Sequence, residues 1–238
     1  MSEGLTGSGL LQSEEEWDER NRVLADNMHE LINRYVVAEL GRAIDVGCQR
    51  GVLTDMLARR TSYRWSGVDP ALTGEDVSPS GVQLLPGRGN SLPFRDAMFD
   101  LGLFANVYEH VPPAERETSL REMHRVLRPG GVLVGQLPNP YFPIESHSRL
   151  PFMGWLPVPA QKAYWRLAPV PWEHDFFVVT IRDLQRTASR VGLETVLVRK
   201  FSYPLEVIPK AARWAAKLLE RPLRHVPWAW QFVLRRPH

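Results

Sequence analysis

The sequence predicts an α/β fold in which a mostly parallel sheet is covered by helices on both faces. Between residues 42 and 137, short apolar runs suited to buried strands alternate with segments of helical period. The first run, 42–46, passes through a glycine turn into a helix-period segment at 52–59. The alternation then breaks in a long stretch rich in proline and aromatic residues, which predicts an insertion into the domain.

The composition fits one domain with a substantial core. Apolar residues make up 44% and charged residues 24% of the 238 positions, which argues against wholesale disorder. A net charge of +2 does not by itself indicate nucleic-acid binding. The single cysteine, Cys48, excludes an internal disulfide framework and a multi-cysteine metal site, and a buried structural thiol is its expected role. No cluster of ligand residues indicates a catalytic metal.

We expect a cytoplasmic protein, because the sequence shows no secretion signal and no apolar run approaching 18 residues. Residues 1–12 are rich in Gly and Ser and are expected to be disordered, and 13–238 should form the single domain. Ser13 and Glu16 predict a capping box for a helix that ends at Gly41 and covers one side of the ligand cleft.

The glycine turn predicts a ligand site. It reads Asp45-x-Gly47-x-x-x-Gly51, with the carboxylate on the strand and a helix N-terminus directly behind. The dinucleotide fingerprint G-x-G-x-x-G does not match, because Gln49 stands where its second glycine would be. The second strand, 64–68, ends in Asp69-Pro70. A carboxylate at this strand tip can accept both ribose hydroxyls of a nucleoside, although Asp-Pro pairs also form ordinary turns.

Further motifs follow in the same order as in one known family. They are a third strand at 82–85, Leu92-Pro-Phe…Phe99-Asp100, a fourth strand at 101–105, Glu109-His110-Val111, a helix at 115–127, Arg128-Pro-Gly-Gly131 and a fifth strand at 132–137. Together with the glycine turn, these motifs resemble the class I S-adenosylmethionine (SAM) methyltransferases of the methyltransferase type 11 kind. The resemblance covers residues 40–137 strongly and the remainder only in layout.

The resemblance implies a Rossmann-like three-layer sandwich with a seven-stranded, mostly parallel sheet whose last strand is antiparallel. It implies SAM as cofactor and S-adenosylhomocysteine as product. Arg88 stands where relatives carry an acidic adenine contact, so Gly89, Asn90 and Ser91 are expected to serve instead. The expected cofactor-binding residues are Asp45, Gly47, Gln49, Gly51, Asp69, Pro70, Gly89, Asn90, Ser91, Asn106 and Val107. Glu109 and His110 are mostly architectural in similar proteins.

The insertion, 138–178, should hang over the cleft as a cap, because it follows the carboxyl end of a central strand. Its rings and prolines suit an acceptor-binding cap, although they also suit simple packing onto the domain. His147 and His174 are candidate general bases, each with a carboxylate nearby in sequence; surface or packing histidines are the alternative. Glu145, Arg149 and Trp172 are the expected acceptor contacts.

The C-terminal part predicts a helix at 180–191, capped by Thr180, and strands at 193–201 and 228–235. Between these strands, the sequence of 204–227 predicts a basic amphipathic helix. This helix could form a lid over the acceptor, pack on the domain with its basic face in solvent, or make a peripheral membrane contact.

The expected function is SAM-dependent methylation of a small molecule, with a hydroxyl oxygen of a secondary metabolite or glycosyl compound favoured. N- or C-methylation of a small or lipid-linked acceptor is the first alternative. A SAM-fold binding protein without turnover is the second, and a membrane adaptor is the third.

Overall fold

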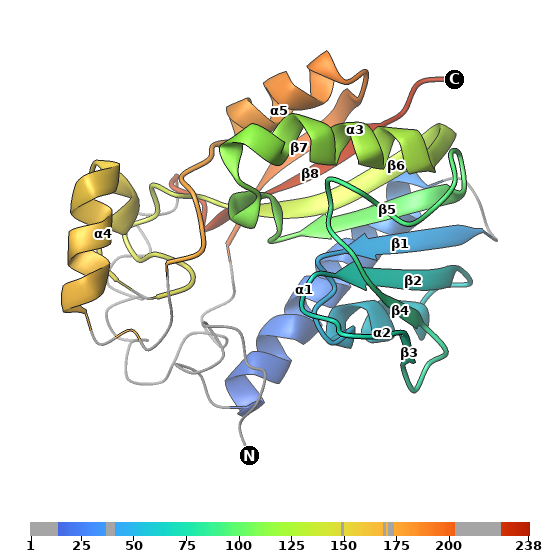
Figure 1. The fold of residues 1–238 in the computed structure, drawn as a ribbon, viewed down its shortest axis with the longest axis horizontal. Coiled ribbons are helices and arrows are strands. Elements are labelled where there is room, and N and C mark those ends of the chain that lie inside the picture. The colour runs from blue at the N-terminus through green and yellow to red at the C-terminus, as the bar shows by residue number, and fades with distance from the viewer. Residues whose placement is uncertain (1–13, 37–40, 149, 169, 171–173, 203–224) are drawn as a thin grey trace.

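A computed structural model of the chain describes residues 14–36, 41–148, 150–168, 170, 174–202 and 225–238 (Figure 1). The described strands are β1 (Arg42–Val46), β2 (Arg64–Asp69), β3 (Asp76–Val77), β4 (Gln83–Pro86), β5 (Phe99–Ala105), β6 (Leu127–Pro138), β7 (Glu194–Phe201) and β8 (Ala229–Arg235). The described helices are α1 (Glu14–Tyr35), α2 (Val52–Ala58), α3 (Arg116–Val126), α4 (Val158–Leu167) and α5 (Ile181–Arg190), with short 3₁₀ turns η2 (Tyr108–His110), η3 (Pro113–Glu115) and η4 (Met153–Trp155).

All described strands belong to one sheet with the order β3-β4-β2-β1-β5-β6-β8-β7. The central strands β4, β2, β1, β5 and β6 run parallel, and β8 is antiparallel to both of its neighbours. This confirms the predicted fold class, including the antiparallel last strand. The predicted count of seven is wrong, because the two-residue strand β3 adds an antiparallel edge to β4. Both residues of β3 are exposed, so no apolar pattern marks this strand in the sequence.

The helices form a layer on each side of the sheet (Figure 1). Helices α1 and α2 contact each other and share one apolar cluster, whereas α3 and α5 pack over the opposite face. Successive residues of β1 divide between the layers, with Ala43 in the cluster under α1 and α2 and Ile44 in the cluster under α3 and α5. The buried strand β1 is therefore fixed from both sides, and its carboxyl end is held in place.

The cap insertion is more regular than the sequence suggested. No helix was predicted between residues 138 and 178, but this segment contains η4 and α4. Prolines stand at the N-cap and in the first turn of α4, where a missing N–H breaks no helical hydrogen bond. Met153, Trp165 and Phe176 form a small apolar core of the cap. The prolines thus start a helix rather than stiffen a loop.

In the C-terminal half, the predicted helix and the two predicted strands are present as α5, β7 and β8. Thr180 caps α5 in a reciprocal capping box with Asp183. The predicted capping residue Ser13 and residues 204–224 of the predicted lid lie outside the described residues. Within the described part of the chain, no helix is long and apolar enough to cross a membrane.

Candidate functional site

A cavity of about 430 Å³ opens at the carboxyl ends of β1, β2 and β5. Strand order reverses between β1 and β5, which is where open α/β sheets bind ligands. The N-terminal half of α1 lines another side of it, as predicted for this helix. Its walls are formed by Trp17, Arg20, Asn21, Leu24, Asp45, Gly47, Cys48, Gln49, Arg50, Val52, Leu53, Asp69, Pro70, Ala105, Asn106, Val107, His110, His147 and Asp175.

A second cavity, of about 470 Å³, lies beside the amino ends of β1 and β2 and is lined by residues such as Arg42, Tyr63 and Arg64. None of the described residues that were predicted to act in binding or catalysis lines it. The first cavity is therefore the candidate site.

The glycine turn and the tip of β2 are joined by hydrogen bonds at the cavity wall. Gly47, Gln49 and Gly51 all have positive φ, of 79°, 51° and 77°. The Gln49 N–H donates to Oδ2 of Asp69 at 2.8 Å, and the Ala71 N–H donates to Oδ1 at 2.8 Å. Because a carboxylate oxygen has two lone pairs, both oxygens of Asp69 can still accept from a sugar hydroxyl. The bond to Asp69 also supports the left-handed backbone at Gln49, a conformation that favours glycine.

Asp45 lies under the turn, 3% exposed, and accepts a hydrogen bond of 2.5 Å from Oγ1 of Thr54. Burial raises the pKa of Asp45 to about 7, the Thr54 hydroxyl opposes this, and the nearby Asp69 adds to it. The neighbouring Cys48 is buried, and burial raises the pKa of its thiol, so a structural role fits it better than a nucleophilic one.

Asn106 follows β5 with a φ of 57° and is fixed by a chain of amides. Its N–H donates to the carbonyl oxygen of Gln136 at 2.8 Å, and Nε2 of Gln136 donates to Oδ1 of Asn106 at 3.1 Å. Nε2 of Gln231 in turn donates to Oε1 of Gln136 at 3.2 Å. These bonds run from β8 through β6 and fix the orientation of Asn106 at the cavity wall.

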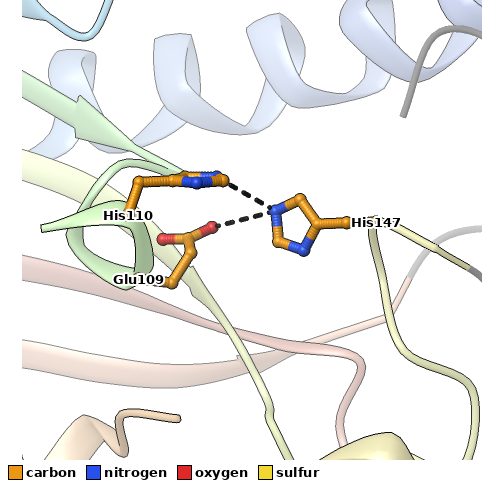
Figure 2. Close-up of side chains that lie close together, drawn as sticks. All are labelled: Glu109, His110 and His147. Atoms are coloured by element: carbon orange, nitrogen blue, oxygen red, sulfur yellow. Dashed lines mark hydrogen bonds and ion pairs between the residues drawn. The ribbon is translucent and has the colours of Figure 1, made fainter. Parts of the chain in front are cut away.

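The cap brings a histidine next to η2 (Figure 2). Nε2 of His147 lies 3.2 Å from Nε2 of His110 and 3.7 Å from Oε1 of Glu109. The far side of each ring is also held, because Nδ1 of His147 is 2.7 Å from Oε1 of Glu145, and Nδ1 of His110 is 3.1 Å from the backbone oxygen of Asp175. Both histidines line the cavity, so this cluster faces the same space as Asp69.

Burial and neighbouring charges set the electrostatics of the cluster. Burial raises the pKa of Glu109. Burial opposes ionisation of Glu145 as well, but His147 and the backbone N–H groups of residues 147 and 148 hold its pKa down at about 2. For His110, burial acts to lower the pKa, and hydrogen bonding and charge from Asp175, with charge from Glu109, outweigh it and raise the pKa to about 9.

Several predicted residues lie elsewhere. Gly51, Gly89, Asn90 and Ser91 are not among the residues that line the cavity, and Nδ2 of Asn90 donates to Glu115 at 2.7 Å. His174 packs its ring against Trp165 and Phe176 within the cap instead of lining the cavity.

Glu145 was predicted to contact the acceptor, but its carboxylate accepts hydrogen bonds from its own loop, from the N–H groups of His147 and Ser148 and the Ser148 hydroxyl. It therefore positions His147 instead. Arg149 and Trp172, the other predicted acceptor contacts, fall outside the described residues.

Three groups at this site were not predicted to act together. Glu109 and His110 were interpreted as architectural, and Asp175 was not among the predicted site residues. The Glu-His pair at the end of β5 was the available sequence signal, but its meeting with His147 depends on the fold of the cap.

Comparison with known proteins supports a methyltransferase. Residues 44–135 match a family model described as a methyltransferase domain. An uncharacterized methyltransferase from Mycobacterium sp. (strain JLS) is 39% identical over 98 residues, which cover 40% of this chain and only 38% of that relative. A demethylmenaquinone methyltransferase from Staphylococcus aureus is 25% identical over 78% of this chain and 83% of its own length. Among solved structures, an S-adenosylmethionine-dependent methyltransferase from Mesorhizobium loti superposes with a TM-score of 0.60 at 18% identity, covering 89% of this chain and 100% of that one.

Proposed function

This chain is a class I SAM-dependent methyltransferase, whose residues 44–135 match the methyltransferase-domain model, and we propose that it methylates a hydroxyl oxygen of a small molecule. One observation carries the proposal. A single cavity is lined by the glycine turn and Asp69 and, across the same space, by the histidines of Figure 2. Its volume of about 430 Å³ falls in the range of small-molecule sites, roughly 300–1,000 Å³.

The residues present fit SAM. A Cβ at Gly47 would overlap the side chain of Val107, so the backbone there leaves room that only glycine provides. We assign Asp69 to the ribose hydroxyls, because its two oxygens form a fork at the tip of β2. Asp45, Gly47 and Gln49 would hold the amino-acid part, and Pro70, Asn106 and Val107 would line the remainder. Gly51 is the N-cap of α2 directly behind the turn. Bound SAM supplies a methyl group on a sulfonium whose leaving group is a neutral thioether.

His147 is the proposed proton acceptor. The ionised Glu145 accepts from Nδ1–H at 2.7 Å, which leaves the lone pair of His147 on Nε2, the atom nearest His110. A hydroxyl that gives its proton to Nε2 becomes a stronger nucleophile, an effect worth about 10²–10⁴-fold in rate. Alignment of acceptor and methyl donor in one closed space contributes more, about 7–11 kcal/mol in favourable cases.

Methylation of a carbon of a quinone-like or lipid-linked acceptor is the second candidate. It is favoured by the Staphylococcus aureus relative, whose name gives demethylmenaquinone as its substrate. The cytoplasmic location and a peripheral membrane contact through 204–227 remain predictions.

The test is a screen of phenols, sugars, amines and quinones with a methyl-labelled donor, read by mass spectrometry of the products. We expect a methyl ether with the wild-type chain and much less of it with His147→Ala. Isothermal titration with SAM and S-adenosylhomocysteine accompanies the screen. Binding of neither ligand would remove the enzyme hypothesis.

A further inference from the structure

We propose that Glu109, His110 and His147 bind one divalent transition-metal ion, such as Zn²⁺, at the acceptor end of the cavity (Figure 2). The sequence alone indicated no metal site. The inference deepens the proposed function and rests on it only for the role of the ion, because the ion site is argued from the side chains themselves.

The orientation of the two imidazole rings of His110 and His147 is explained by a cation between their Nε2 atoms. Nδ1 of His147 lies 2.7 Å from a carboxylate oxygen of Glu145, and Nδ1 of His110 faces the backbone oxygen of Asp175. The Ser146 hydroxyl is also 3.2 Å from Nδ1 of His147, but it donates its hydrogen to the Glu145 carboxylate. The carboxylate and the backbone oxygen only accept hydrogen bonds, so both Nδ1 atoms carry hydrogen. In neutral rings the lone pairs are then on the Nε2 atoms, which face each other across 3.2 Å. Two lone pairs at this distance repel unless a proton or a metal ion lies between them.

Glu109 distinguishes a metal ion from a shared proton. Its side chain is 5% exposed, and within the described part of the chain neither carboxylate oxygen has a hydrogen-bond partner. A buried carboxylate without partners is costly. A proton shared by the two nitrogens would still leave these oxygens without a donor. A metal ion satisfies all three groups, since Oε1 of Glu109 lies 3.7 Å from Nε2 of His147.

The ligand atoms already have nearly the spacing of a metal site. With Zn–N bonds of about 2.0–2.1 Å, tetrahedral coordination separates two nitrogens by roughly 3.3 Å. The observed separation is 3.2 Å, and the three ligand atoms lie within 4.8 Å of one another. The acceptors behind each Nδ1 supply the outer contacts that metal-bound histidines usually have. Two histidines and one carboxylate is a ligand set that catalytic zinc and iron sites use.

The fourth coordination position would face the cavity, because His110 and His147 line it. An acceptor hydroxyl bound there would ionise more easily, as water does on catalytic zinc. Its proton goes to water in the cavity, and its oxygen forms a bond to the methyl carbon. The carbon–sulfur bond breaks, and its electron pair stays on sulfur as the neutral thioether. With the ion bound, Nε2 of His147 is a ligand and the ion replaces it as the group that activates the hydroxyl.

The test uses the full chain, stripped with a chelator and dialysed. Zn²⁺ binding is measured by competition with a chromophoric chelator, and Co²⁺ binding by its visible absorption. We expect one ion per chain and the intense spectrum of a four-coordinate cobalt site. Glu109→Gln and His110→Ala should weaken binding by more than the about 10–100-fold that loss of an outer partner costs, and Glu145→Gln should fall within that range. His29→Gln, which removes an imidazole on α1 paired with Asn33, should change nothing.

Melting curves establish whether each variant is folded. The Co²⁺ spectrum of the wild type tests the ion site even if a variant fails to fold. Failure of the wild type to bind either ion would overturn the proposal, and so would affinities that are the same in all variants. Methyl transfer that continues undiminished in chelator-treated protein would overturn the role of the ion and leave the methyltransferase function intact. Failure of the wild type to bind SAM both with and without the ion would count against the proposed function and not against the ion site.

Discussion

Replacement of Gly47 by alanine tests the glycine turn through two separate effects. Gly47 has a φ of 79°, and a left-handed alanine costs about 1–2 kcal/mol. The new methyl group would also overlap Cγ2 of Val107 and lie 2.9 Å from its Cγ1, an overpacking that costs about 1–3 kcal/mol. We expect Gly47→Ala to lower the free energy of unfolding by about 2–5 kcal/mol, out of about 5–15 kcal/mol for a typical domain.

The chain provides a matched control for the backbone effect. Gly81 has a φ of 78°, and nothing lies within 4 Å of a Cβ added there, so Gly81→Ala should show the backbone strain alone. Val107→Ala in the Gly47→Ala background should recover part of the packing loss. Urea unfolding measures stability, and isothermal titration measures SAM affinity, which we expect to fall at least tenfold in Gly47→Ala only. Equal losses of stability at Gly47 and Gly81, with SAM affinity intact, would show that no steric clash with Val107 occurs at Gly47.

Three further predictions concern the carboxylates and His147. Asp69→Ala should weaken SAM binding about 10- to 150-fold, the value of a hydrogen bond to a charged group, and unchanged affinity in titration would mean that the ribose lies elsewhere. His147→Ala should lower turnover by about 10²-fold or more without changing SAM affinity; full activity in a labelled-methyl assay would exclude it from the chemistry. Burial raises the pKa of Asp45 from 3.8 to about 7, so its contribution to stability is complete below pH 3.8 and is lost as the pH rises through 7. Urea midpoints of wild type and Asp45→Asn should therefore diverge as the pH rises from 3.8 to about 7 and the wild type loses stability. Parallel curves would contradict this assignment.

The cavity wall formed by the glycine turn and the tip of β2 could be predicted because its geometry is local. Gly47 and Asp69 stand at strand ends that the apolar pattern locates, and parallel pairing brings the tips of β1 and β2 together. Gln49 was harder to interpret, since its left-handed backbone and its bond to Asp69 appear only in three dimensions.

The cluster of His110, His147 and Asp175 could not be predicted to the same extent. His110 and His147 come from η2 and the cap, and Asp175 reaches the cluster from beyond α4. Their contact depends on how the cap packs on the domain, and the periodicity of apolar residues in the sequence does not predict that packing. The prolines near the start of α4 also concealed a helix, because proline in a first turn and proline in a loop look alike in sequence.

A crystal structure of the chain with bound S-adenosylhomocysteine tests the shared cavity most directly. We expect the ribose within hydrogen-bonding distance of Asp69 and the sulfur facing His110 and His147. A ligand bound outside this cavity, or a cavity filled by side chains such as Gln49, would contradict the assignment of one site to both the donor and the acceptor.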